Sequence, residues 1–172
     1  MIEMMKKVAL GTGLSLAMAV GVLSTSVNAA DMAADAVPPG VTAYATGAEF
    51  EDVRFNLETA IVNRGLVIDY VSHIGDMLAR TKEDVGGTKD LYANAVSMLF
   101  CSANLSRKMM EADPGNIAYC PYAVFAYEKA EDPGSVLVGF RRLDETGSDA
   151  SKAAIAEINT LLDDIVKEAA GE

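Results

Sequence analysis

The chain contains only two cysteines, Cys101 and Cys120, and their chemistry makes them the first candidates for a functional site. Cys101 precedes Ser102, a residue suited to begin a helix, and the positive end of a helix dipole favours a thiolate. The sequence leaves three interpretations open: a disulfide, typically worth about 2–4 kcal/mol, two buried apolar thiols, or a reactive or metal-binding pair. A bridge needs Cα atoms within about 7 Å, which sequence spacing does not establish.

Aromatic and polar side chains beside the cysteines are the candidates for contacting a ligand. Phe100 and Asn104 lie close to Cys101 in the sequence, and Tyr119 and Tyr122 lie close to Cys120. The two cysteines are expected on turns that flank one helix, at one end of a sheet. We therefore predict a ligand-binding site at that end.

The single histidine, His73, is a second candidate because it could bind a metal or haem. Asp69 precedes it by four residues and Met77 follows it by four. Imidazole, thioether and thiolate groups together suit a soft metal such as copper, or axial ligation of haem. Covalent c-type haem is excluded because the chain has no Cys-x-x-Cys-His motif. The plainer interpretation is that His73 is a surface or hydrogen-bonded structural residue.

Familiar catalytic motifs are absent from the sequence. It has no Gly-x-Ser-x-Gly elbow, no His-Glu-x-x-His and no Cys-x-x-Cys. We therefore predict a small non-catalytic binding protein with its site around the cysteines. The alternative is a thiol-redox or metal- or haem-handling protein that uses His73, Met77, Cys101 and Cys120.

The first 29 residues have the pattern of a secretory signal peptide. Lys6 and Lys7 precede an uncharged apolar run from Val8 to Leu23, and Val27 and Ala29 occupy the −3 and −1 positions of a cleavage site. The run is short for a membrane span of about 20 residues. We predict cleavage after Ala29, a periplasmic protein without a stable membrane span, and a flexible tail over 30–40.

The composition restricts the partners of the mature chain. The full chain has a formal charge of −11, and removing one Glu and two Lys with the signal peptide gives the mature chain a charge of −12. An acidic surface repels nucleic-acid phosphates, so a nucleic acid is not an expected partner, whereas a small molecule or metal remains one. A periplasmic location also permits a disulfide, because that compartment is oxidising.

Hydrophobic periodicity predicts one α/β domain over 41–170, an α+β two-layer sandwich with about five strands and helices packed on one face. Particular expectations are a Thr46-x-x-Glu49 capping box, a core-facing Tyr70, and a slightly long hairpin turn over 129–134. The last helix should bury one stripe: Ile155, Ile158, Leu162, Ile165 and Ala169.

The expected order of elements is β-α-β-(α)-β-α-β-β-α. The elements are strand 41–45, helix 48–64, strand 66–73, short helix 74–80, strand 93–101, a helix capped by Ser102 and ended at 113–116, strands 120–128 and 135–143, and a helix capped by Ser148 or Asp149.

Several of these segments, taken in order, resemble a known family. The segments are the helix from Phe50 to Gly65 with the following strand, Cys101-Ser102-Ala103-Asn104-Leu105, Glu111-Ala112-Asp113-Pro114, and Cys120-Pro121 leading into a Val- and Phe-containing strand. Together they resemble the domain of unknown function 302 family over about 41–169. The resemblance implies a compact two-layer α/β fold, often dimeric, and it implies no activity.

Overall fold

The structure is a computed structural model that describes residues 37–172. The expected signal peptide, its cleavage site after Ala29 and residues 30–36 of the expected tail lie outside the described residues. Of the tail, residues 37–40 turn into the first strand, where the Val41 amide donates to the Pro38 carbonyl over 3.2 Å.

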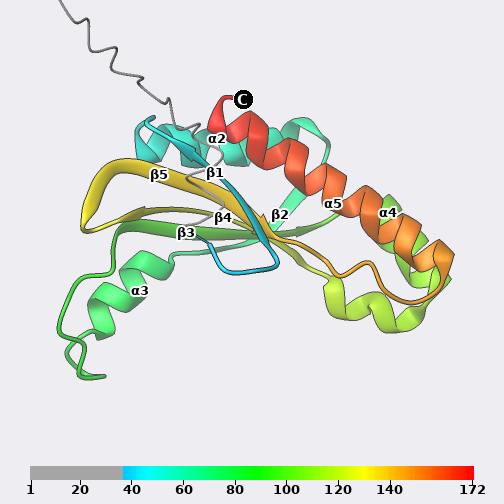
Figure 1. The fold of residues 1–172 in the computed structure, drawn as a ribbon, viewed down its shortest axis with the longest axis horizontal. Helices are drawn as coiled ribbons and strands as arrows, with labels where there is room; N and C mark the ends of the chain where they lie inside the picture. The colour runs from blue at the N-terminus through cyan, green and yellow to red at the C-terminus, as the bar shows by residue number, and fades with distance from the viewer. Residues whose placement is uncertain (1–36) are drawn as a thin grey trace, which may run out of the picture.

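Five antiparallel strands form a single sheet in the order β1-β5-β4-β3-β2 (Figure 1). The segment whose sequence suits either a strand or a buried helix is β3, as predicted. The strands are β1 (Val41–Thr46), β2 (Val67–Ser72), β3 (Tyr92–Cys101), β4 (Tyr122–Lys129) and β5 (Asp132–Arg141).

Three helices, α2, α4 and α5, lie over one face of this sheet, which confirms the predicted two-layer α+β fold (Figure 1). α5 packs against α2, α4, β5 and β1, and the short α3 packs against β3 beyond the end of β2. No helix of the described part is long and apolar enough to cross a membrane. The helices are α2 (Phe50–Asn63), α3 (Ile74–Thr81), α4 (Ala103–Ala112) and α5 (Asp149–Ala170), and the 3-10 helix η1 (Pro114–Tyr119) follows α4.

The core lies between the sheet and the pair α2 and α5. It consists of apolar side chains from both layers, and their removal from water is the main force that holds a two-layer domain together. The predicted stripe on α5 is confirmed, since every residue named for it is buried. The largest buried residues include Leu57, Ile61, Met98, Phe100, Tyr122, Phe140, Ile155, Ile158, Leu162 and Ile165.

Two predicted helix starts are confirmed and one is wrong. Ser102 caps α4 by accepting from the Leu105 amide, and Ser148 caps α5 in the same way. The Thr46-x-x-Glu49 capping box does not form, because Glu49 itself is the N-cap residue of α2 and makes no side-chain cap bond. Thr46 stays in β1, where it pairs with Val136 of β5.

The predicted face of β2 is wrong at Tyr70, because the strand contains a bulge. Ile68 pairs with Phe100 but Tyr70 pairs with Leu99, so two residues of β2 correspond to one step of β3. One extra residue inverts the alternation of side chains. Tyr70 is consequently 62% exposed, and Val71 packs against the core instead.

The predicted turn over 129–134 is wrong as well, because the β4–β5 hairpin is tight. Lys129 pairs directly with Asp132, which leaves two residues in the turn. Gly134 remains in β5 with a φ of +87°, a conformation that glycine adopts without steric cost. Its amide donates to the Glu128 side chain over 2.7 Å, which holds the irregular strand in place.

Buried asparagines secure the segments that join the sheet to the helices. Asn159 of α5 donates to the Leu143 carbonyl and accepts from the Leu143 amide, each over 2.9 Å. Asn116 donates to the Met109 carbonyl and to Ser151. Both side chains satisfy buried backbone or hydroxyl groups that would otherwise lack partners.

Candidate functional site

The structure joins Cys101 and Cys120 by a disulfide. Their Cα atoms are 6.2 Å apart, within the range that a bridge requires. Cys101 is the last residue of β3, and Cys120 directly follows η1. The bridge therefore joins the two ends of the segment that contains α4 and η1, at the end of the sheet where β4 begins. Both cysteines are half-buried.

A buried hydroxyl pair lies beside this disulfide. The Ser106 and Tyr122 oxygens are 2.7 Å apart, and Ser106 Oγ lies 3.6 Å from Cys120 Sγ. Because a disulfide sulfur carries no proton, Ser106 donates to the sulfur and Tyr122 donates to Ser106. Burial raises the pKa of Tyr122 above its ordinary value.

The four side chains predicted to contact a ligand have different environments. Phe100 and Tyr122 are 0% and 1% exposed and meet edge to face in the core, with ring centroids 5.9 Å apart. Asn104 is exposed on α4. Tyr119 is half-buried, and its hydroxyl donates to the Asp144 carbonyl over 3.2 Å. In the structure as it stands, only Asn104 and Tyr119 present surface to a ligand.

A hollow of about 520 Å³ adjoins Tyr119 at this end of the sheet. It lies between η1, the segment before β1 and the chain at the end of β5, where Arg141 is the last strand residue and Arg142 follows it. Arg142 is paired with Glu145 at 3.3 Å. A ligand site near the cysteines therefore stays a prediction. The hollow that could form it is lined by Tyr119 and not by the sulfur atoms.

His73 and Met77 are not brought to the cysteines. His73 follows the last residue of β2, which pairs with Ser97, and Cys101 is four residues farther along β3, or about 13 Å. The exposed His73 ring lies 4.0 Å from the Asp76 carboxylate, and Met77 is 42% exposed. Within residues 37–172, no three His, Cys, Asp or Glu side chains gather to hold a metal.

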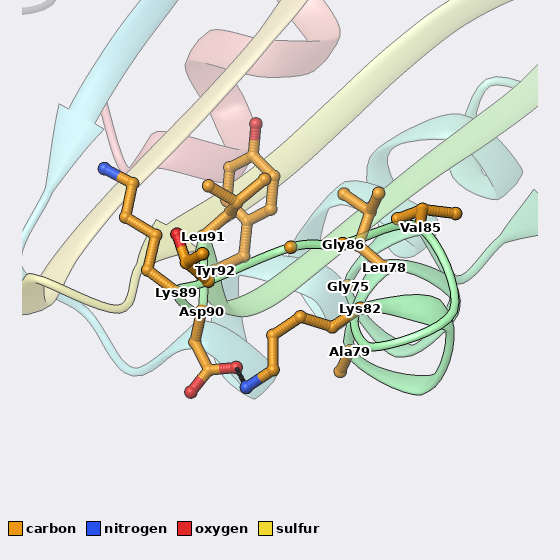
Figure 2. A pocket seen from close by; sticks show the side chains of 12 residues that line it. Gly75, Leu78, Ala79, Lys82, Val85, Gly86, Lys89, Asp90, Leu91 and Tyr92 are labelled. Carbon is orange, nitrogen blue, oxygen red and sulfur yellow. Dashed lines mark hydrogen bonds and ion pairs between the residues drawn. The ribbon is translucent and has the colours of Figure 1, made fainter.

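An apolar hollow of about 300 Å³ lies elsewhere, between α3 and the chain that returns from it to β3 (Figure 2). Leu78 of α3 and Val85 of the return segment form one side, and Leu91 and Tyr92 form the other (Figure 2). Apolar walls with a few polar groups at the rim are typical of small-molecule sites.

Glycines allow the backbone to make this hollow. A Cβ atom on Gly75 would lie 2.9 Å from the Ala95 amide nitrogen, so glycine lets α3 approach the backbone of β3. Gly87 likewise leaves no room for a Cβ beside Lys82. The Lys82 ammonium pairs with Asp90 at 2.9 Å and joins the two ends of the loop at the rim (Figure 2).

The sequence does not predict this hollow, because the expected elements leave 81–92, between the short helix and the next strand, without a role. Two signals were present. Val85 interrupts a run of charged and small residues, and Leu91 directly follows the end of that run. Both side chains are exposed in the structure. Exposed apolar side chains that gather at one place indicate a binding surface, whereas single ones do not. Their gathering depends on how α3 packs on β3, which no local pattern reveals.

These observations define a class of protein: a small two-layer α+β domain with one antiparallel sheet, a disulfide at one end and an apolar hollow at the other. Residues 42–169 match the family described as Domain of unknown function DUF302, and the chain belongs to this family. The resemblance found in the ordered sequence segments is thereby confirmed.

A solved structure has a similar fold. It is described as "Crystal structure of uncharacterized conserved protein DUF302 from Bacillus stearothermophilus". The similarity has a TM-score of 0.63 at 12% sequence identity, and it covers 77% of this chain and 99% of the other. At this identity the comparison supports the fold alone. No curated protein matches the chain.

Proposed function

We propose that this protein is an exported, non-catalytic binding protein that holds a small apolar ligand in the hollow between α3 and β3. The observation that carries the proposal is the hollow itself: about 300 Å³ bounded by Leu78, Val85, Leu91 and Tyr92 and open to solvent. A ligand there would remove apolar surface from water, which favours binding by roughly 25 cal/mol per Å² buried.

The side chains around the hollow support binding rather than catalysis. Its lining offers apolar contacts, and the Lys82 ammonium is engaged by Asp90 at 2.9 Å. General acid–base chemistry would need a titrating group directed at a reacting atom, with a pKa near the working pH. The lining supports retention of a ligand through its shape and apolar surface.

Export is part of this proposal, and its support is the sequence of the first 29 residues. A periplasmic protein would lose them and would form the Cys101–Cys120 disulfide in an oxidising compartment. Intact mass spectrometry of protein purified from the periplasm tests both. We expect a chain that begins at Ala30 and is lighter by two hydrogens than the reduced chain. A full-length, reduced product in the cytoplasm would contradict export.

The binding proposal is tested with 8-anilinonaphthalene-1-sulfonate, an aromatic probe whose fluorescence rises in apolar surroundings. Ala79 is exposed and lines the hollow, so Ala79→Phe should occupy the space without disturbing the core. Ala153, exposed on α5, provides the matched control Ala153→Phe. We expect Ala79→Phe to weaken probe binding about tenfold or more, because the new ring competes for the same space.

The control separates this result from non-specific binding. Ala153→Phe should bind the probe as the wild type does, and both variants should retain the wild-type circular dichroism spectrum. Equal probe affinity in all three proteins would show that the probe does not occupy the α3 hollow and would contradict the proposal.

A second candidate function is thiol–disulfide exchange at Cys101 and Cys120. The specific observation is that both cysteines are half-buried rather than buried, and that Cys101 directly precedes Ser102, the N-cap residue of α4, whose N-terminus would stabilise a thiolate. A partner dithiol would supply two electrons, reducing the bridge to two thiols while becoming a disulfide itself. Equilibration with a glutathione redox buffer tests this: a bridge that stays oxidised at about −300 mV is structural.

A further inference from the structure

Tyr92, the first residue of β3, lines two apolar hollows at once. One is the hollow beside α3, and the other, of about 450 Å³, lies on the sheet face opposite α2 and α5. Its ring contacts the Tyr127 ring edge to face, with centroids 5.5 Å apart. The two hollows are therefore adjacent parts of one apolar surface, which we call the Tyr92 track.

The second hollow has an aromatic floor. Phe125 stacks on Tyr127 with centroids 5.9 Å apart, and the two rings pack beside the small buried patch of Ala43 and Leu137. Val37 closes the far side, because the segment before β1 packs on the same patch. Half-buried aromatic rings in such a row provide a large apolar contact area.

We propose that the Tyr92 track binds an elongated anionic amphiphile, such as a free long-chain carboxylate, with its chain extended from the α3 hollow across Tyr92 to the aromatic hollow. This inference rests on the proposed function and specifies its ligand class. A compact ligand would fill one hollow, whereas an extended chain covers the apolar surface of both.

The width of the sheet sets the length of the chain. The track crosses from Tyr92 on β3 over β4 and β5 to Val41 on β1. Three steps between neighbouring strands amount to roughly 14 Å across the sheet. Val41 also lies farther along the strands, since it pairs with Arg141 at the far end of β5 whereas Tyr92 pairs with Lys129 beside the β4–β5 turn, so this distance is the least length of the track. The extended chain of dodecanoate has a length of that order, and the chain of hexanoate spans only part of the distance.

Lysines at the rim of the Tyr92 track favour a ligand with a negatively charged head group. Lys89 borders the α3 hollow and Lys129 borders the aromatic hollow, and neither pairs with a carboxylate among residues 37–172. Figure 2 shows Lys89 reaching outward on the side away from α3. The chain as a whole is strongly acidic, with 14 basic against 25 acidic residues. Two unpaired lysines along an apolar surface therefore favour an anionic amphiphile over a cationic one.

Calorimetric titration of the exported, oxidised protein with hexanoate, dodecanoate and dodecyltrimethylammonium, each kept below micelle formation, tests the proposal. A buried CH₂ contributes about 0.8 kcal/mol, or roughly fourfold in affinity. Even if only half of the added chain is buried, dodecanoate should bind about 50-fold more tightly than hexanoate. The cationic amphiphile should bind more weakly than dodecanoate.

Variants locate the two ends of the ligand. Phe125→Ser should weaken dodecanoate binding and leave hexanoate binding unchanged, with the exposed Phe55→Ser on α2 as matched control. The double variant Lys89→Glu/Lys129→Glu should weaken dodecanoate binding about three- to tenfold, as expected for exposed charges, with Lys152→Glu as control. The charge variants alter exposed or half-buried side chains, so they test the proposal even if Phe125→Ser is poorly folded.

The outcomes separate this inference from the function on which it rests. If hexanoate and dodecanoate bind equally, and Ala79→Phe weakens both, the α3 hollow is a binding site but the track is not. If Ala79→Phe changes neither, the proposed function fails as well. If dodecanoate does not bind and light scattering shows a dimer that Phe125→Ser dissociates, a second copy of the chain covers the aromatic face, and the amphiphile is excluded.

Discussion

The hydroxyl oxygens of Ser106 and Tyr122 lie 2.7 Å apart in the buried layer behind the Cys101–Cys120 disulfide. Ser106 comes from α4 and Tyr122 from β4, so the pair links helix to sheet at the point where the disulfide links β3 to η1. Two different cross-links therefore hold α4 at this end of the domain. The arrangement is that of a structural junction.

Replacing Tyr122 by Phe tests the contribution of the hydroxyl pair. The variant keeps the ring in the core but leaves the Ser106 oxygen without its 2.7 Å partner. A buried polar group that loses its hydrogen bond costs about 1–3 kcal/mol. We expect the free energy of unfolding in urea to fall by about 1–2 kcal/mol. An unchanged value would show that a water replaces the phenol.

The raised pKa of Tyr122 also makes stability depend on pH in the alkaline range. Burial raises the pKa of Tyr122 in the folded state above its ordinary value of 10.0. The folded state then holds its proton more tightly than the unfolded state, so the stabilisation is complete below about pH 10 and is lost as the pH rises through the folded pKa. Above pH 10, the stability of Tyr122→Phe should therefore decline less steeply than that of the wild type. Parallel declines would contradict this assignment.

The disulfide should stabilise the domain by closing a chain loop with a sequence separation of 19. In the chain-entropy description, a loop of this length is worth about 3 kcal/mol. We expect the double variant Cys101→Ala/Cys120→Ala to unfold at lower urea concentration, with a loss of about 2–4 kcal/mol. Adding reductant should shift the wild type toward the variant and leave the variant unchanged. A variant as stable as the oxidised wild type would rule out a stabilising bridge.

The Asn159 side chain should contribute strongly to the free energy of unfolding, because it forms hydrogen bonds with both the amide and the carbonyl of Leu143. Asn159→Ala leaves two buried backbone groups without partners, at about 1–3 kcal/mol each before water enters. We expect a loss of about 2–4 kcal/mol in the free energy of unfolding. Thr160→Ala on the exposed side of α5 is the control and should change stability by no more than about 0.5 kcal/mol. A similar small effect of Asn159→Ala would show that the 143–148 connection does not need this anchor.

Much of the fold could be predicted from the sequence because its signals are local. The stripe on α5 repeats at helical spacing, Ser102 and Ser148 precede helices that they cap, and Gly65 ends α2 with a φ of +72°. Each of these features depends on residues within one or two turns of chain. The order of elements was recovered for the same reason.

The candidate site was harder to predict because it depends on packing between distant segments. Phe100 and Tyr122 lie next to the cysteines in sequence, yet strand alternation directs both into the core. The α3 hollow requires Gly75 to lie against β3 and Lys82 to meet Asp90, contacts that no periodic pattern encodes. His73 and Cys101 are far apart for a similar reason, since β2 and β3 are antiparallel and the two residues occur at different positions along the pair.

The bulge in β2 gives the clearest contrast between pattern and packing. Simple alternation directs Tyr70 into the core and Val71 away from it, whereas the shifted register with β3 exposes Tyr70 and packs Val71 against the core. Tyr70→Thr should therefore change the free energy of unfolding by no more than about 0.5 kcal/mol, as at other exposed sites. Val71→Thr keeps the shape of the side chain but places a hydroxyl among apolar groups, and should cost about 1–2 kcal/mol. Urea unfolding of both variants decides the matter, because a strand without the bulge would reverse their order.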